Sequence, residues 1–123
     1  MTPVFKVCRG CGNLVIAAKD CEMTCCGEAM RTLKANTVDA SNEKHIPVVT
    51  VEGDKVEAVV GSVIHPMLPE HSIQCIVLET EKGWQKKDLN PGEEPKAVFT
   101  VTDDKPVAVY EYCNLHGLWK AEI

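Results

Sequence analysis

The chain has 123 residues and a net charge of −5, with 45% hydrophobic and 25% charged residues. These values are typical of one folded domain, or of one domain with a smaller unit stabilised by something other than a core. The negative charge argues against nucleic acid as the main partner, because phosphate contacts require clustered lysine and arginine. No apolar run approaches the length of a membrane span, and the first residues do not resemble a secretory leader. We therefore expect a soluble, cytoplasmic protein that binds neither nucleic acid nor membrane.

Residues 1–36 carry five of the seven cysteines and few large apolar side chains. This segment is too poor in apolar residues to fold unaided, so we predict that a bound metal stabilises it. Cys8-Arg9-Gly10-Cys11 and Cys25-Cys26-Gly27 each bring two thiols together, and their glycines allow the tight turns that this requires. Four thiolates suit zinc or iron equally well by spacing, and a redox disulfide in the first motif is the alternative.

Two further cysteines fall outside these motifs. Cys21 is predicted to be a free thiol, and Cys75 is predicted to be a core residue, because free cysteine packs like a small hydrophobic side chain. An odd number of cysteines without a leader sequence favours metal or redox chemistry over a framework of disulfides.

From Lys44 onward, short stretches rich in valine and isoleucine alternate with turn residues, and no convincing helix or repeat is found. Gly53-Asp54 is typical of a hairpin turn, and Asp103-Asp104-Lys105 is expected to join two strands that pair with each other. His45 is expected to open the first strand. Strands of this length and spacing predict a β-sandwich. The expected strands are residues 46–52, 56–60, 72–80, 96–102, 106–112 and 119–123.

All four histidines lie in suggestive surroundings. His65 and His71 stand at either end of a loop stiffened by two prolines, and Cys113 and His116 share a second tight loop. If these loops meet His45 at one end of the sandwich, four imidazoles and one thiolate converge on one ion. Such a ligand set suits iron, zinc or copper, and it leaves a sixth octahedral position vacant for a small oxygen species. The alternative is that the histidines are unrelated.

Taken together, the two sets of motifs resemble desulfoferrodoxin, the two-iron form of superoxide reductase, over essentially the whole chain. The cysteine motifs are similar to those of a desulforedoxin-type domain. The chain departs from the family in the additional Cys21 and in a shorter stretch between Cys11 and Cys25. The motifs that are similar to the catalytic domain are Glu43-Lys44-His45-Ile46-Pro47, His65-Pro66-Met67, Glu70-His71-Ser72-Ile73 and Cys113-Asn114-Leu115-His116-Gly117-Leu118-Trp119.

The resemblance implies a mainly β protein: a small rubredoxin- or desulforedoxin-like metal domain (1–36) followed by an immunoglobulin-like catalytic sandwich (37–123). It implies two irons per chain, without haem or nucleotide. The implied ligands of the Fe(Cys)4 centre are Cys8, Cys11, Cys25 and Cys26. The implied ligands of the Fe(His)4(Cys) centre are His45, His65, His71 and His116 in a plane, with Cys113 axial.

The resemblance also implies an activity, which is one-electron reduction of superoxide to hydrogen peroxide with electrons from a rubredoxin-like donor, in a homodimer. Lys44 would attract the anion and orient a water for proton delivery. Glu43 resembles the residue that takes the sixth position in the oxidised resting state and helps peroxide to leave. An iron electron-transfer protein without a substrate of its own is the alternative.

Overall fold

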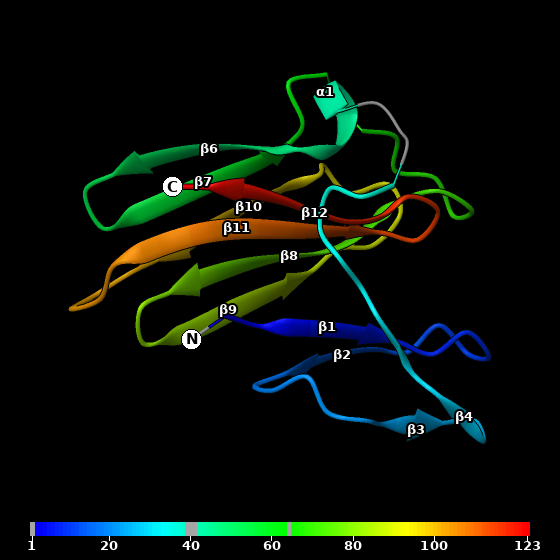
Figure 1. The fold of residues 1–123 in the computed structure, drawn as a ribbon. Coiled ribbons are helices and arrows are strands. Elements are labelled where there is room, and N and C mark those ends of the chain that lie inside the picture. Colours follow the sequence, from blue (N-terminus) through cyan, green and yellow to red (C-terminus); the bar gives the residue numbers. More distant parts are fainter. Residues whose placement is uncertain (1, 39–41, 64) are drawn as a thin grey trace. The chain divides into compact units, whose positions relative to one another are not determined.

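The computed structural model describes residues 2–38, 42–63 and 65–123, and for Glu43 it describes the backbone alone. The chain divides into two compact units, Met1–Lys34 and Ala35–Ile123. Figure 1 shows their elements, nearly all of which are strands. Among the described residues, no helix is long and apolar enough to cross a membrane.

The first unit consists of two small antiparallel pieces. Strands β1 (Val4–Val7), β2 (Leu14–Ala17) and β5 (Arg31–Thr32) form a sheet in the order β2-β1-β5. Strands β3 (Thr24–Cys25) and β4 (Glu28–Ala29) form a separate hairpin. Phe5 and Met30 are the buried large apolar side chains of this unit. With so little apolar surface buried, the unit depends on another source of stability.

The second unit is a sandwich of two antiparallel sheets. One sheet has the order β10-β7-β6 and the other has the order β12-β11-β8-β9. The strands are β6 (Pro47–Glu52), β7 (Lys55–Val60), β8 (Ile73–Thr80), β9 (Gly83–Asp88), β10 (Lys96–Thr100), β11 (Pro106–Cys113) and β12 (Gly117–Glu122). The predicted fold class, a small metal domain followed by an immunoglobulin-like sandwich, is confirmed.

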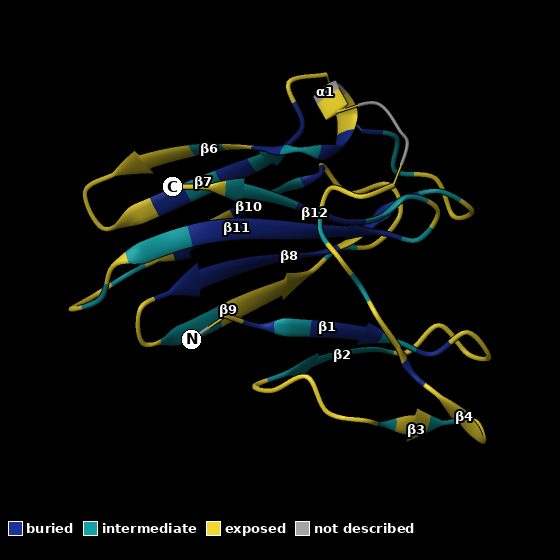
Figure 2. Ribbon diagram, in the orientation of Figure 1, coloured by how far each residue is buried: buried dark blue, intermediate teal, exposed yellow. Residues whose placement is uncertain are grey.

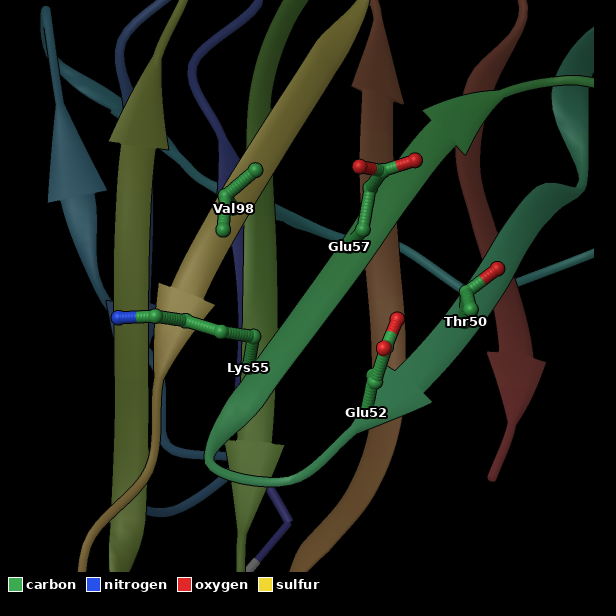
Figure 3. Close-up of a pocket in the computed structure, with 5 residues that line it drawn as sticks. All are labelled: Thr50, Glu52, Lys55, Glu57 and Val98. Atoms are coloured by element: carbon green, nitrogen blue, oxygen red, sulfur yellow. The ribbon is translucent and has the colours of Figure 1, made fainter.

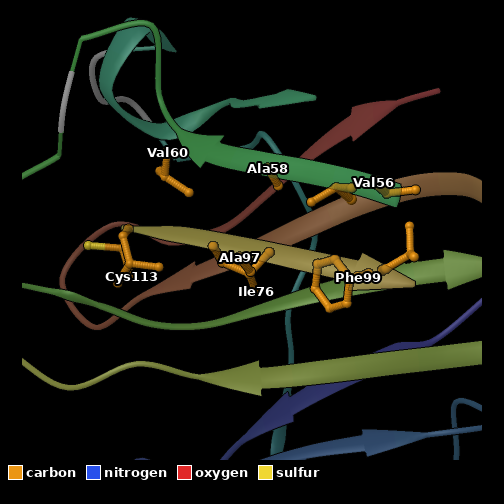
Figure 4. Packing of buried hydrophobic residues seen from close by; sticks show 10 residues of the cluster. Val56, Ala58, Val60, Ile76, Ala97, Phe99 and Cys113 are labelled. Carbon is orange, nitrogen blue, oxygen red and sulfur yellow. The ribbon is translucent and has the colours of Figure 1, made fainter. Parts of the chain in front are cut away.

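Side chains that alternate in burial along the strands form the core between the two sheets. On β7, Val56, Ala58 and Val60 are buried, whereas the residues between them are more exposed. Figure 2 shows the buried residues concentrated on β8 and β11, the central strands of the larger sheet. Figure 4 shows that Cys113 lies at one end of this apolar cluster. The core therefore ends at a residue that is a predicted metal ligand.

Two local predictions were wrong. The segments around Asp103-Asp104-Lys105 were expected to pair with each other, but β10 pairs with β7 and β11 pairs with β8 and β12. Strand β9 already occupies the edge of β8, and the chain crosses from one sheet to the other after β10. His45 was expected to open a strand, but it ends the one-turn helix α1 (Asn42–His45), and β6 begins at Pro47.

The predicted hairpin at Gly53 is confirmed, because the glycine has a φ of 58° and β6 and β7 pair on either side of it. A positive φ at this position is the reason that glycine is favoured there. The hairpin places the carboxyl end of β7, and with it the loop that leads to His65, at the same end of the sandwich as α1.

Candidate metal centres

The first candidate centre consists of four thiols whose sulfur atoms all lie within 4.8 Å of one another: Cys8, Cys11, Cys25 and Cys26. The sulfurs of Cys11 and Cys25 are 3.8 Å apart. Metal–sulfur bonds of about 2.3 Å in a tetrahedron place two sulfurs ~3.8 Å apart, so this spacing fits a four-coordinate ion. The backbone N–H of Cys11 lowers the pKa of Cys8 to about 7, which favours its thiolate form. The donor set therefore suits zinc or iron.

The backbone bends sharply beside each pair of thiols. Cys26 and Gly27 form the turn of the β3–β4 hairpin, with φ values of 54° and 76°. Two consecutive residues with positive φ define a tight hairpin turn, which non-glycine residues adopt at a cost. In the other loop, a methyl group on Gly10 would lie 3.2 Å from Cys26 Cβ and 3.6 Å from Cys8 Sγ. This absence of a side chain lets the two loops approach closely enough for their sulfurs to share an ion.

The second candidate centre brings together the five side chains that were predicted from three separate segments. Their ligand atoms also lie within 4.8 Å of one another. The segments are α1, the loop between β7 and β8, and the turn between β11 and β12, and the residues are His45, His65, His71, Cys113 and His116. From the sequence, a shared site was predicted only if these loops meet. The structure shows that they do meet.

The four imidazoles of this centre form a closed ring. Neighbouring ring centroids are 4.7 Å (His45–His65), 4.7 Å (His65–His71), 5.1 Å (His71–His116) and 4.8 Å (His45–His116) apart. Each neighbouring pair meets nearly at right angles, with interplanar angles between 77° and 89°. Edge-on rings turn their nitrogens toward a common centre, as four ligands around one ion require.

The distances between the donor atoms match metal coordination. His45 Nε2 lies 3.1 Å from both His65 Nε2 and His116 Nδ1. Metal–nitrogen bonds of about 2.1 Å that meet at right angles place two nitrogens ~3.0 Å apart. Cys113 Sγ lies 3.5 Å from His65 Nε2. His71 Nε2 is buried and has no hydrogen-bond partner among the described residues. A buried imidazole nitrogen that lacks a hydrogen-bond partner destabilises the fold unless it binds a ligand. The residues of this centre therefore fit a bound metal.

Burial and hydrogen bonding prepare His65 as a ligand. Its Nδ1–H donates to the carbonyl of Pro66 at 2.7 Å, so Nε2 carries the free lone pair that faces the other donors. Burial lowers the pKa of His65 to about 4, and burial also lowers the pKa of His71. Both rings are therefore neutral near pH 7, which is the form that binds metal.

Sequence reasoning missed the residues that support the ligands. Trp119 is buried, stacks on His45 with a centroid distance of 5.0 Å, and donates its indole N–H to the carbonyl of His116 at 2.9 Å. Asn114 bonds to the backbone on both sides of His71. Asn114 and Trp119 lie in segment 113–119, which also carries two of the candidate ligands. Their closeness to these ligands in sequence was the one signal that could have indicated a supporting role.

The structure places the two charged residues of the Glu43-Lys44-His45 segment on α1. The Lys44 side chain is exposed, and its charge contributes, after burial and the charge of His116, to lowering the pKa of His71. The side chain of Glu43 lies outside the described part of the chain. Its predicted role therefore stays a prediction.

The remaining cysteines follow the sequence analysis. Cys75 is buried on β8, and burial raises the pKa of its thiol to about 12, as for a core residue. Cys21 is an exposed free thiol. Glu111, which was not singled out, is fully buried on β11 and neither carboxyl oxygen has a hydrogen-bond partner among the described residues. Burial raises its pKa well above the usual range.

A hollow of about 330 Å³ lies on the outer face of the β10-β7-β6 sheet, and none of its lining residues belongs to a candidate centre. Figure 3 shows that its lining side chains come from these three strands. Two of its charged groups have partners: Lys55 Nζ donates to Thr100 Oγ1 at 2.8 Å, and Glu57 lies 3.5 Å from Lys96 Nζ. No histidine or cysteine lines it, so it is an ordinary solvated surface.

The chain, including both candidate centres, is similar in sequence and structure to known proteins of one family. Residues 37–122 match the family model described as Desulfoferrodoxin. A desulfoferrodoxin homolog of Archaeoglobus fulgidus is 44% identical, over 98% of this chain and 99% of its own length. Desulfoferrodoxin of Nitratidesulfovibrio vulgaris is 45% identical, over 97% and 94%. The crystal structure of the superoxide reductase from Treponema pallidum covers 99% of this chain and 100% of that one, at a TM-score of 0.86 and 41% identity.

Proposed function

The chain belongs to the desulfoferrodoxin family and is a superoxide reductase, and we propose that its catalytic site is the cluster of four histidines and Cys113. The observation that carries this assignment is the convergence of five donor atoms within 4.8 Å of one another, one of them a buried and unpartnered imidazole nitrogen. The proposed ligands are His45, His65, His71, Cys113 and His116.

The reaction adds one electron and two protons to superoxide and gives hydrogen peroxide without releasing dioxygen. The five residues of the cluster would hold an iron ion, which would supply the electron and a binding position for superoxide. The chain's own residues hold the ion, keep the imidazoles neutral and exclude other ligands from the buried side. Trp119 supports two of these ligands directly, through its stacking on His45 and its hydrogen bond to the backbone of His116.

Lys44 is the proposed substrate-attracting residue. It is exposed, directly precedes His45 in the sequence and acts electrostatically on His71, so it provides local positive potential on a chain of net charge −5. A local cation raises the concentration of a small anion at a site even when the whole molecule is negative. The same group is suited to orient a water for proton delivery to the product. For Glu43 we propose the role of aiding peroxide release, on the strength of the family motif alone.

The second iron is proposed to be held by the four thiols of Cys8, Cys11, Cys25 and Cys26. We propose that residues 1–36 form a desulforedoxin-like iron domain and that residues 37–123 form the catalytic domain. In support, the chain divides into compact units at Lys34, and the family model begins at residue 37. The sulfur spacing and the close approach at Gly10 support the ligand set.

We further propose that the protein works in the cytoplasm, receives electrons from a rubredoxin-like donor and forms a homodimer. All seven cysteines are free, and a reducing compartment keeps ligand thiols in that state. The donor and the dimer rest on the resemblance to the family. An electron-transfer protein without a substrate of its own is the alternative, but the proposed role of Lys44 in attracting a small anion has no place in it.

The activity is tested by mixing the ferrous protein with a pulse of superoxide and measuring both products. We expect one hydrogen peroxide for each superoxide consumed, oxidation of one iron, and no dioxygen. Release of dioxygen together with peroxide would indicate dismutation. Iron that ignores superoxide would leave only the electron-transfer function.

A further inference from the structure

Asn114 lies in the turn between the proposed ligands Cys113 and His116, and its side chain reaches the loop that carries His71. Its Oδ1 accepts a hydrogen bond from the backbone N–H of Ser72 at 3.0 Å, and its Nδ2 donates to the carbonyl of Glu70 at 3.0 Å. Its own backbone N–H donates to the carbonyl of Ser72 at 3.3 Å. Three hydrogen bonds therefore join two ligand-bearing loops that are more than forty residues apart in sequence.

The carboxamide binds the backbone immediately before and immediately after His71. The N–H and carbonyl of His71 itself are taken up by Leu68, at 3.1 and 2.9 Å. The short loop is thus held by the hydrogen bonds between His71 and Leu68 inside it and by those of Asn114 from the other loop. Since Asn114 is half-buried, its amide exchanges these contacts for water less readily than an exposed side chain would.

His71 is the ligand that most needs such support. The rings of His45, His65 and His116 are linked by nitrogen–nitrogen contacts of 3.1 Å, and Trp119 or Pro66 hold them further. His71 Nε2 has no hydrogen-bond partner among the described residues. The placement of this nitrogen consequently depends on the placement of its backbone, which Asn114 fixes relative to Cys113 and His116.

We propose that Asn114 is a positioning residue for metal binding, which acts through His71 by holding its loop against the Cys113–His116 turn. This inference rests on the ligand assignment in the proposed function. Neighbours that orient metal ligands typically change metal affinity by about 10- to 100-fold when they are removed. An effect of that size on retention of the ion is expected here.

The test measures Co²⁺ affinity at the histidine cluster of the full-length chain by competition with a chelator. Paramagnetically shifted imidazole signals report this centre and not the four-thiol centre, which has no histidine. Four proteins form a double-mutant cycle: wild type, Asn114→Ala, His71→Ala and the double variant. Asn90→Ala is the matched control, because the Asn90 amide bonds to Glu93 in an exposed turn outside the ligand loops.

We expect Asn114→Ala to weaken Co²⁺ binding about tenfold or more and to have no further effect once His71 is alanine. Asn114→Asp keeps the acceptor for Ser72 but loses the donor to Glu70, so it should fall between alanine and wild type, while Asn90→Ala should bind like wild type. Equal losses in both backgrounds, or no loss in either, would overturn the inference. If His71→Ala alone left the affinity unchanged, the ligand assignment of the proposed function would fail, and this inference with it.

Discussion

Two imidazoles of the histidine cluster are prepared for metal binding by specific contacts. His65 is held in one tautomer by the Pro66 carbonyl, and His45 is packed against the Trp119 ring. Burial keeps His65 and His71 neutral near pH 7. Pre-organisation of this kind reduces the cost of assembling five ligands around an ion.

Replacement of Lys44 by alanine should slow the reaction with superoxide, because the change removes a positive charge that acts on His71 of the cluster. We expect the second-order rate constant to fall about tenfold, and its dependence on ionic strength to weaken. Stopped-flow or pulse-radiolysis measurements at low and high salt would show both effects.

Lys55→Ala is the matched control for this variant. It changes the net charge by the same amount, but Lys55 lies in the hollow on the outer face of the β10-β7-β6 sheet (Figure 3). If the two variants slowed the reaction equally, overall charge rather than the position of Lys44 would govern the rate.

The residues that converge at the two candidate centres were predictable from sequence, whereas the residues that support them were not. The ligands occur in short motifs whose residue types suit metal binding by themselves. Asn114 and Trp119 act through hydrogen bonds and stacking with residues distant in sequence, and neither residue type indicates such a role alone. The position of Glu43 relative to the site stays a prediction.

At the scale of elements, the turns decide which side chains meet. The Cys8–Cys11 loop and the β3–β4 hairpin approach each other only because Gly10 has no side chain. Gly10→Ala should lower metal affinity at the four-thiol centre by about tenfold, because the new methyl group lies only 3.2 Å from Cys26 Cβ and must displace it. Chelator competition monitored by the thiolate charge-transfer bands of Co²⁺ measures this. Affinity at the histidine cluster should not change, and loss at both centres would contradict the account.

A buried side-chain pair links strands β8 and β11. The phenol of Tyr110 donates to Glu79 at 2.8 Å, and burial followed by this hydrogen bond raises the pKa of Tyr110 from 10.0 to about 12. The folded state therefore holds the phenol proton more tightly than the unfolded state does. This contribution to the free energy of unfolding is complete below about pH 10 and is lost as the pH rises toward about 12.

Urea unfolding of wild type and Tyr110→Phe at about pH 9 and about pH 11 tests this link. The variant should be less stable by about 1 kcal/mol at the lower pH, where Glu79 loses its donor. Its stability should then fall less steeply as the pH rises. Cys75, whose pKa is also raised, contributes equally to both proteins. An identical pH dependence in the two proteins would refute the assignment.

Strand positions in the second unit were largely predictable, because the alternation of apolar residues and the turn at Gly53 are local signals. Strand pairing was not. The connection at Asp103-Asp104-Lys105 looks like a hairpin turn, yet it carries the chain from one sheet to the other. Only the packing of both sheets on a common core determines which neighbour each strand selects.

At the scale of the whole molecule, two units use different sources of stability. The second unit has a contiguous apolar core between its sheets, shown in Figure 4, and the histidine cluster lies where that core ends at Cys113. The first unit buries few large apolar side chains and carries four converging thiols. One chain thus combines a core-stabilised sandwich, which carries the proposed catalytic site, with a unit whose folding is expected to depend on a metal.

The central claim is that superoxide is reduced at the cluster that contains Cys113. The most direct measurement compares wild type, Cys113→Ser and Cys75→Ser, each in the ferrous state, for peroxide formed after a superoxide pulse. Both cysteines are almost fully buried, at 0% and 1% exposure, so the two serine variants carry a similar packing change. We predict that Cys75→Ser forms peroxide like wild type and that Cys113→Ser loses the reaction. Equal activity in the two variants would contradict the account.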